Sequence, residues 1–324
     1  MTGIVETLKE KVLAGNLISK EEAMTLVDVP LEALALAADE IREAFCGNRF
    51  DMCTIINGKC GKCSEDCKYC SQSAHYNTNC EESYPLLDTR AILAQAKNND
   101  DRGVLRYSIV TSGKRLSNVE VDQVCESIKT IKAETGIEVC VSFGLLDEEQ
   151  FRKIKAAGAS RVHCNLESSR RFFKEVCSTH TYDEKIETLK AAQRAGLSIC
   201  SGGIMGLGET MEDRIDMVLT ARELGVKSIP VNLLNPIPGT PYEHNRILTN
   251  EELCKIVAIF RFLIPDGSIR LAGGRGLVGD KGEKCFKSGA NAAISGDMLT
   301  TAGITVETDL KLLGELGYEV RLES

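Results

Sequence analysis

The sequence predicts an α/β fold, a (β/α)8 TIM-type barrel with an N-terminal helical extension. The chain has 324 residues, of which 43% are hydrophobic, enough to bury one large core. After about residue 45, eight short strand-like runs alternate with segments of helical apolar spacing. Eight βα units with right-handed crossovers favour closure into a barrel, and an open doubly wound sheet is the alternative.

The first 45 residues are expected to form helices that cap the barrel. Apolar residues recur at helical spacing in VETLKEKVLAG (5–15), KEEAMTLVD (20–28) and LEALALAADEIREAF (31–45). Residues 46–324 contain no internal repeat, low-complexity segment or linker-like cluster of Pro and Gly. We therefore expect 46–324 to be the barrel and the whole chain to be a single domain.

The expected barrel strands are short runs rich in apolar and β-branched residues. Helical segments between them, such as 121–135, 184–196 and 211–225, often end at glycine. In a parallel barrel, side chains alternate between the lumen and the helix layer, and chemistry collects where the strands end. The eight runs are CTIIN (53–57), LRYSIVT (105–111), IEVCVSF (137–143), RVHCNLE (161–167), LSICSGG (197–203), SIPVNLL (228–234), SIRLAGG (268–274) and ANAAIS (290–295).

The charge balance argues against nucleic acid as a partner. There are 39 Lys and Arg against 47 Asp and Glu, net −8, without a basic tract. The N-terminus lacks the apolar core of a signal peptide, and no stretch reaches the roughly 18 apolar residues of a membrane span. We expect a cytoplasmic chain that does not bind a membrane.

The chain contains 14 cysteines, and cytosolic thiols stay reduced, so metal binding is the leading explanation. Cys63, Cys67 and Cys70 form a C-x3-C-x2-C pattern directly after the first expected strand. Three thiolates at this spacing can hold three corners of a cubane iron-sulfur cluster and leave the fourth iron open. A structural zinc site, with Cys60 or His75 as fourth ligand, is the alternative, although the spacing is unusual for zinc.

This pattern, with Tyr69 just before its last cysteine, resembles the signature of the radical S-adenosylmethionine enzymes. The stretch CSEDCKYCSQS (63–73) resembles the biotin synthase family in particular. Further likenesses follow in the family's order over most of the chain. They are RVHCNLESS (161–169), ICSGGIMGLGET (199–210), LLNPIPGTP (233–241), IRLAGGR (269–275) and MLTT (298–301).

The resemblance implies a reaction and its cofactors. A 4Fe-4S cluster on the three loop cysteines would bind S-adenosylmethionine and cleave it reductively to a 5′-deoxyadenosyl radical. The radical would abstract hydrogen from dethiobiotin, and sulfur from a second, auxiliary iron-sulfur cluster would close the ring of biotin. This chemistry belongs to the cofactors, which the protein positions and shields. A flavodoxin- or ferredoxin-type electron donor, iron-sulfur assembly machinery and a homodimer are also implied.

The resemblance also assigns roles to residues of this chain. Glu167 would accept the ribose hydroxyls, with Tyr69, Gly202 and Gly203 also lining the cofactor site. Lys185 stands where relatives often carry Arg for the methionine carboxylate, so the bidentate fork is lost. The expected substrate contacts are His163, Asn165, Thr300 and Thr301.

The chain departs from the family at the second cluster, usually a 2Fe-2S centre with three cysteines and an arginine. Cys140, Cys200 and Arg270 match three of the positions, but Ser108 replaces the cysteine of the second strand. A serine hydroxyl is a poor ligand beside thiolates. Cys53, on the neighbouring first strand, restores a third thiolate. We expect the set Cys53, Cys140, Cys200 and Arg270, with either a 2Fe-2S or a four-iron cluster.

Other readings stay open. Alternatively, Cys53 is a buried residue that only packs in the core. Cys125 and Cys254 lie within helical patterns and are expected to pack in the hydrophobic core. Strand alternation directs Cys164 toward the helices unless a bulge turns it inward. A related radical enzyme of the hydrogenase-maturation or methylornithine-synthase type is the alternative function, and a non-catalytic electron carrier is a second alternative.

Overall fold

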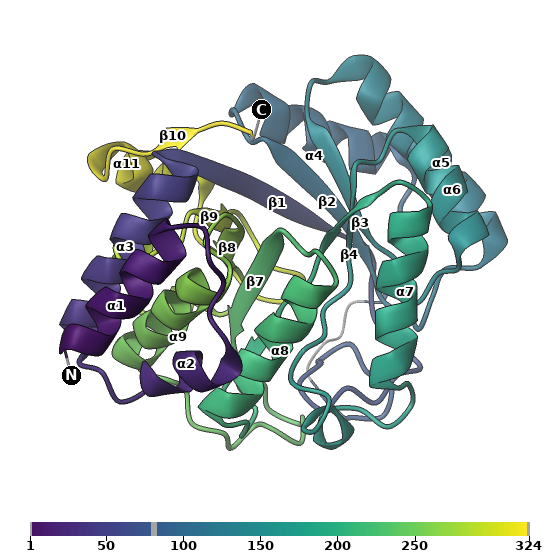
Figure 1. Ribbon diagram of the computed structural model, residues 1–324. Coiled ribbons are helices and arrows are strands. Elements are labelled where there is room, and N and C mark those ends of the chain that lie inside the picture. The colour runs from purple at the N-terminus through teal and green to yellow at the C-terminus, as the bar shows by residue number, and fades with distance from the viewer. Residues whose placement is uncertain (1, 79–82, 323–324) are drawn as a thin grey trace.

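The computed structural model describes residues 2–78 and 83–322, which form a closed parallel barrel surrounded by helices (Figure 1). The barrel closes because β1 pairs with both β2 and β9. The predicted (β/α)8 barrel is confirmed, and the open sheet is wrong. The barrel strands are β1 (Arg49–Lys59), β2 (Arg106–Thr111), β3 (Glu138–Ser142), β4 (Arg161–His163), β5 (Ser198–Cys200), β7 (Ser228–Leu233), β8 (Ser268–Leu271) and β9 (Ala292–Ile294).

Every barrel strand except β1 is shorter than its expected run, and the difference is largest for two of the runs. The run 197–203 is divided into β5 and β6 (Gly203–Met205), and both segments pair with β7. The run 161–167 ends as a strand at His163. Four residues later Glu167 has a left-handed backbone, with φ of 67°. Regular alternation therefore stops at His163, and the next residues take directions that the sequence pattern does not fix.

Helices cover the outside of the barrel and direct the loops at the carboxyl ends of the strands. Several begin with a capping box in which a Ser or Thr hydroxyl accepts a backbone N–H, as at Ser117, Thr181, Thr210 and Thr249. The helices are α4 (Thr89–Asp101), α5 (Asn118–Glu134), α6 (Glu148–Ala157), α7 (Tyr182–Arg194), α8 (Met211–Glu223), α9 (Asn250–Leu263), α10 (Glu283–Phe286) and α11 (Val306–Glu315), with short 3-10 turns η1 (Phe173–Glu175) and η2 (Arg275–Leu277).

The N-terminal segment is helical, as expected. It comprises α1 (Thr2–Leu13), α2 (Lys20–Thr25) and α3 (Leu31–Cys46). These helices pack against α8 and α9 on the outside of the barrel, at the purple end of the colour scale in Figure 1. A terminal strand, β10 (Glu319–Val320), pairs with the start of β1. The division of the chain at residue 45 remains a prediction.

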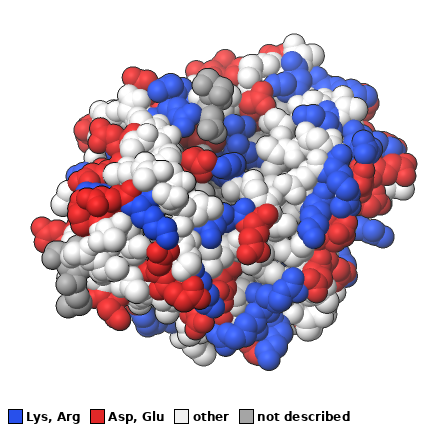
Figure 2. All heavy atoms as spheres, viewed as in Figure 1, with Lys and Arg blue, Asp and Glu red and all other residues white. Residues whose placement is uncertain are grey.

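The surface carries both signs of charge. Figure 2 shows acidic and basic side chains interspersed over the visible face. Within the described ranges, none of the helices combines the length and the apolar character needed to cross a bilayer.

Candidate active site

A cavity of about 430 Å³ at the carboxyl ends of the strands brings two sets of cysteines together. The three loop cysteines are partly exposed, whereas the three strand cysteines are buried. One cavity is therefore lined by a partly exposed set and a buried set of sulfur donors. The loop set is Cys63, Cys67 and Cys70, and the strand set is Cys53, Cys140 and Cys200.

The loop set lies on a segment that folds back on itself directly after β1. The N–H of Cys63 donates to the carbonyl of Gln72 at 2.9 Å, and the N–H of Ala74 donates to the carbonyl of Cys63 at 2.8 Å. A tighter turn within it joins the Cys70 N–H to the Cys67 carbonyl at 3.0 Å. These backbone hydrogen bonds fix three free thiols around one cavity wall, and this donor set fits a cubane with one open iron.

The strand set projects from β1, β3 and β5. Cys140 lies beside Ser108 of β2 in the sheet register, while Cys53 pairs with Arg106. Burial raises the pKa of the Cys53 thiol, and the neighbouring Cys140 raises it further. Three buried sulfur donors, of which Cys53 disfavours a free thiolate, fit a bound metal cluster, because its iron ions would neutralise the thiolate charge.

Cys200 differs from Cys53 in its electrostatic surroundings. Burial is the largest single effect and would raise the pKa of its thiol, but the hydrogen bond and electrostatic interaction with His163, together with nearby arginines, outweigh it. The positive charges of Arg270 and Arg161 act in the same direction and lower the pKa of Cys200 to about 7. This sulfur is therefore the strand cysteine that most readily becomes a thiolate ligand.

Three arginines surround one aspartate at the base of the cavity. Asp51 Oδ2 lies 3.0 Å from Arg106 Nε, 3.4 Å from Arg161 Nη1 and 2.9 Å from Arg270 Nη2. Burial would raise the pKa of Asp51, but the three guanidinium charges, led by Arg270, lower it to about 2. The group carries a formal charge of +2 beside the strand thiols, which favours an anionic cluster.

Sequence reasoning found only Arg270 of this group. Asp51 precedes Cys53 by two residues, Arg106 precedes Ser108, and Arg161 precedes His163. The same alternation that directs one residue of each pair into the lumen also directs the other. That periodicity was a usable signal for Asp51, Arg106 and Arg161.

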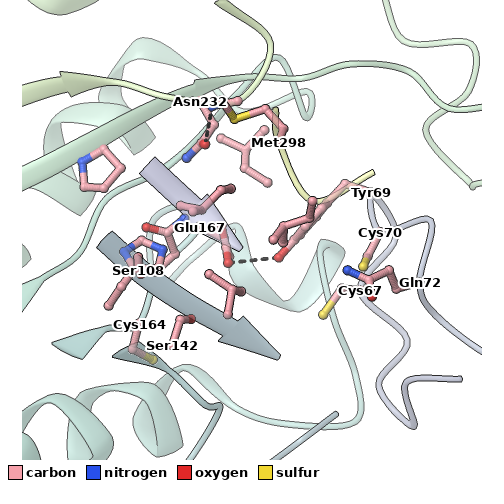
Figure 3. Close-up of a pocket in the computed structure, with 18 of the residues that line it drawn as sticks. Cys67, Tyr69, Cys70, Gln72, Ser108, Ser142, Cys164, Glu167, Asn232 and Met298 are labelled. Carbon is pink, nitrogen blue, oxygen red and sulfur yellow. Dashed lines mark hydrogen bonds between the residues drawn. The ribbon is translucent and has the colours of Figure 1, made fainter. Parts of the chain in front are cut away.

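Polar side chains near the loop set form one wall of the cavity. Tyr69 donates its hydroxyl hydrogen to Glu167 Oε1 at 2.9 Å, and Lys185 Nζ lies 3.8 Å from the same oxygen. Figure 3 shows Tyr69 between Glu167 and the loop that carries Cys67 and Cys70. Glu167 Oε2 is buried and has no hydrogen-bond partner among the described residues. An unpaired carboxylate oxygen in this wall can accept a ligand hydroxyl.

Gly202 and Gly203, expected to line the cofactor site, are required to be glycine for a steric reason. A Cβ on Gly202 would lie 2.0 Å from the Pro230 carbonyl oxygen, and one on Gly203 would lie 2.3 Å from that of Glu167. Both positions therefore require glycine because the backbone of a neighbouring segment approaches closely. Neither residue is among those that line the cavity, so a contact with the cofactor stays a prediction.

The expected substrate residues all line the cavity, at His163, Asn165, Thr300 and Thr301. Asn165 Oδ1 accepts the Gly202 N–H at 3.0 Å, and Thr300 accepts a hydrogen bond from Ser71 at 3.1 Å. The first contact links the segment after β4 to the segment after β5, and the second links the segment after β9 to the cysteine loop after β1.

The expectation that Cys164 faces the helices is wrong. Cys164 lines the cavity, as Figure 3 shows, because β4 ends at His163 and alternation no longer applies. Cys125 and Cys254 are buried on α5 and α9, as expected. His75, considered as a zinc ligand, instead directs Nε2 to the Ser64 carbonyl at 2.9 Å and is exposed.

Comparison with known proteins identifies the family. Residues 59–221 match the radical SAM superfamily, and residues 230–319 match the biotin and thiamin synthesis associated domain. The chain is 60% identical to a biotin synthase of Brachyspira hyodysenteriae, over 98% of this chain and 96% of that protein. It is 59% identical to a biotin synthase of Akkermansia muciniphila, over 99% of both chains.

Solved structures support the fold. A methylornithine synthase superposes with a TM-score of 0.84 at 19% identity, covering 97% of both chains. A maturase of the [FeFe]-hydrogenase superposes with a TM-score of 0.84 at 20% identity, covering 100% of this chain and 76% of that chain. Likeness at these identities shows the fold alone, whereas the biotin synthases are 59–60% identical, so these two activities are not favoured for this chain. The chain belongs to the biotin synthase family of radical SAM enzymes.

Proposed function

We propose that this enzyme takes the sulfur that it inserts into dethiobiotin from a second iron-sulfur cluster bound by Cys53, Cys140 and Cys200. The observation that carries the proposal is the single cavity lined by two separate cysteine sets. Radical SAM membership implies a 4Fe-4S cluster and S-adenosylmethionine, for which one cysteine set suffices. The second set, buried beside three arginines, is the additional feature that sulfur insertion requires.

The residues of the loop set and its wall have the following proposed roles. Cys63, Cys67 and Cys70 would hold the first cluster, which would supply the electron for cleavage of S-adenosylmethionine. Glu167 accepts the ribose hydroxyls through Oε2, and Tyr69 fixes the carboxylate by its hydrogen bond to Oε1. Lys185, buried near Glu167, holds the methionine carboxylate as a single positive charge.

Dethiobiotin would occupy the cavity between the two cysteine sets. Asn165 has an amide group to hydrogen-bond the ureido ring, and its Oδ1 is held by the Gly202 N–H. Thr300 and Thr301, near the loop set, would take the carboxylate tail, and His163 lies beside Cys200.

The position of the third thiolate supports a proposal about the nuclearity of the second cluster. Cys53 aligns with Arg106, whereas Ser108 aligns with Ile55, two residues further along the strands. A thiolate at Cys53 in place of position 108 is therefore displaced by about 4.8 Å between strands and by about 6.6 Å along them. Iron-sulfur bonds do not stretch by such distances. We infer a cluster of different shape from the 2Fe-2S centre, and a four-iron cluster with an expendable sulfide fits.

Arg270 is proposed as the fourth member of this set. Its Nη1 donates to the Asp51 carbonyl at 2.9 Å and to the Ala293 carbonyl at 3.1 Å. Burial would lower the pKa of the guanidinium, but Asp51 and the strand thiols raise it above its usual value. A guanidinium must lose a proton to ligate iron, so a purely electrostatic role for Arg270 competes with direct ligation.

The experiment moves one thiol between strands. We expect Cys53→Ser to lose the second cluster, measured by Mössbauer spectroscopy and iron content after anaerobic reconstitution. The double variant Cys53→Ser/Ser108→Cys should regain a cluster, with a 2Fe-2S spectrum, because three thiolates then lie on β2, β3 and β5. Cys125→Ala, on the outer helix α5, is the matched control. An unchanged second-cluster spectrum in Cys53→Ser would overturn the ligand assignment.

The remaining partners are part of the same proposal. Reductive cleavage of S-adenosylmethionine needs an electron donor, for which a flavodoxin or ferredoxin is suited. Loss of sulfide in each turnover requires iron-sulfur assembly machinery to rebuild the cluster. We also propose that the enzyme is a homodimer and is located in the cytoplasm. Anaerobic incubation with S-adenosylmethionine, reductant and dethiobiotin, followed by mass spectrometry, tests the overall reaction.

A further inference from the structure

A further group of potential metal ligands, Cys67, Cys177 and His180, shares only Cys67 with the two proposed cluster sets. Cys177 Sγ is 3.8 Å from Cys67 Sγ and 3.2 Å from His180 Nδ1. The three ligand atoms all lie within 4.8 Å of one another. Cys177 and His180 belong to the loop between η1 and α7, so two segments far apart in the sequence meet here. Neither residue has a part in the proposed function.

These separations agree with tetrahedral coordination of a single ion. With metal-sulfur bonds of about 2.3 Å, two thiolates on one tetrahedral ion are about 3.8 Å apart. The corresponding sulfur-to-imidazole separation is about 3.5 Å. The distances from Cys177 to Cys67 and to His180 match these edges with little adjustment.

Two carboxylates lie close enough to supply a fourth ligand. Asp66 Oδ1 lies 3.1 Å from Cys177 Sγ, and Glu65 Oε2 lies 2.6 Å from His180 Nδ1. Asp66 is the better candidate for the ion itself, because it is adjacent to a sulfur ligand. Glu65 contacts Nδ1, the same ring nitrogen that faces Cys177, so its hydrogen bond is given up when the ion binds, and its carboxylate becomes a second candidate for the oxygen ligand.

The two loops are already fixed in position by hydrogen bonds. Asp66 Oδ1 accepts the backbone N–H of Ser178 at 2.8 Å and of Thr179 at 3.1 Å, and Thr179 Oγ1 donates to Glu65 Oε2 at 2.9 Å. Cys177 is 3% exposed and His180 is 7% exposed. A cation would thus bind groups that are ordered in advance, at a small entropic cost.

We propose that Cys67, Cys177 and His180, with Asp66, bind one thiophilic divalent cation such as Zn²⁺ when the first cluster is absent. Binding displaces the thiol protons of Cys67 and Cys177 into solvent. Because Cys67 would also ligate the first cluster, the cation and that cluster exclude each other. Mononuclear binding stands independently of the proposed function, whereas the exclusion rests on its assignment of Cys67.

The first test uses full-length, cluster-free protein under anaerobic conditions, titrated with Co²⁺ alone. Tetrahedral cobalt bound to thiolate absorbs strongly in the visible range. We expect Cys177→Ala and His180→Gln to weaken Co²⁺ binding by more than about 100-fold. Cys63→Ala is the matched control, because Cys63 belongs only to the loop set, and it should bind Co²⁺ like the wild type. Circular dichroism verifies that each variant is folded, and the strand cysteines contribute equally to all of them.

The reverse pattern overturns the site. If Cys63→Ala loses the cobalt absorption and Cys177→Ala keeps it, the ion is bound by the three loop thiolates. Equal affinity in all proteins also overturns it.

A second measurement tests the exclusion separately. One equivalent of Zn²⁺ added before reconstitution should slow recovery of the first cluster's absorption in wild type but not in Cys177→Ala. If the wild type reconstitutes equally fast with Zn²⁺, the exclusion is overturned, even where the cobalt titration supports the site.

Discussion

The Tyr69 hydroxyl donates a hydrogen bond of 2.9 Å to Glu167 Oε1, linking the cysteine loop to the chain beyond β4. Tyr69 is partly exposed as a residue, but its hydroxyl reaches a carboxylate that is 7% exposed. Glu167 also has a left-handed backbone, with φ of 67°, which is uncommon for a residue with a side chain. Strain of this kind persists where the surrounding structure enforces it, often at functional sites.

Replacement Tyr69→Phe should therefore weaken S-adenosylmethionine binding. The Glu167 carboxylate loses a hydrogen bond worth about 1–3 kcal/mol when buried, so we expect roughly a tenfold higher Kd. Isothermal titration of the reconstituted protein measures it. Tyr76→Phe is the control, since that hydroxyl donates to the Asp66 carbonyl and not to Glu167. An unchanged Kd in Tyr69→Phe would contradict the role of the pair.

Loss of any loop thiol should abolish cofactor cleavage. In Cys63→Ala, Cys67→Ala or Cys70→Ala, two thiolates remain for a cubane that needs three, so 5′-deoxyadenosine formation should fall to background. Chromatography of the quenched reaction and iron content per chain are the measurements. Cys254→Ala, on the outer helix α9, should retain both. Cleavage at the wild-type rate in a loop variant would refute the ligand set.

Arg270 should affect sulfur insertion more than cofactor cleavage. Arg270→Ala removes one of three positive charges around Asp51 and the strand cysteines, and biotin formation should fall more than tenfold while S-adenosylmethionine is still cleaved. Arg270→Lys distinguishes an electrostatic role of Arg270 from direct ligation of the second cluster. A retained second-cluster Mössbauer spectrum in the lysine variant indicates an electrostatic role, and an altered one indicates ligation. Full biotin formation by Arg270→Ala would leave only a structural ion pair.

The ion pairs between Asp51 and the three arginines should make the free energy of unfolding depend on pH in the acid range. The folded-state pKa of Asp51 is about 2, below its ordinary 3.8, so its contribution is complete above about pH 4 and is lost as pH falls toward 2. The shift corresponds to about 2 kcal/mol. Urea unfolding of wild type and Asp51→Asn, both without clusters, should show a stability gap that narrows by that amount between pH 5 and pH 2. A gap that stays constant over this range would argue against the charge pairing.

The sequence by itself determined the barrel and the loop cysteines. Alternating strand and helix periods specify the order of elements, and the spacing of Cys63, Cys67 and Cys70 is a local property of one loop. The family resemblance added Glu167, Asn165 and Arg270, and all three lie where the strands end or inside the lumen. Their chemical roles are proposals that the variants above address.

Only the tertiary structure decided which distant residues meet. Arg106 and Arg161 reach Asp51 because closure of the barrel brings β1, β2 and β4 around one lumen. Cys177 meets Cys67 because two loops of different strands dock, and no spacing along the chain encodes that contact. Strand periodicity specifies the face of a side chain only while the strand continues. Beyond its end, packing and hydrogen bonds with the rest of the fold set the direction.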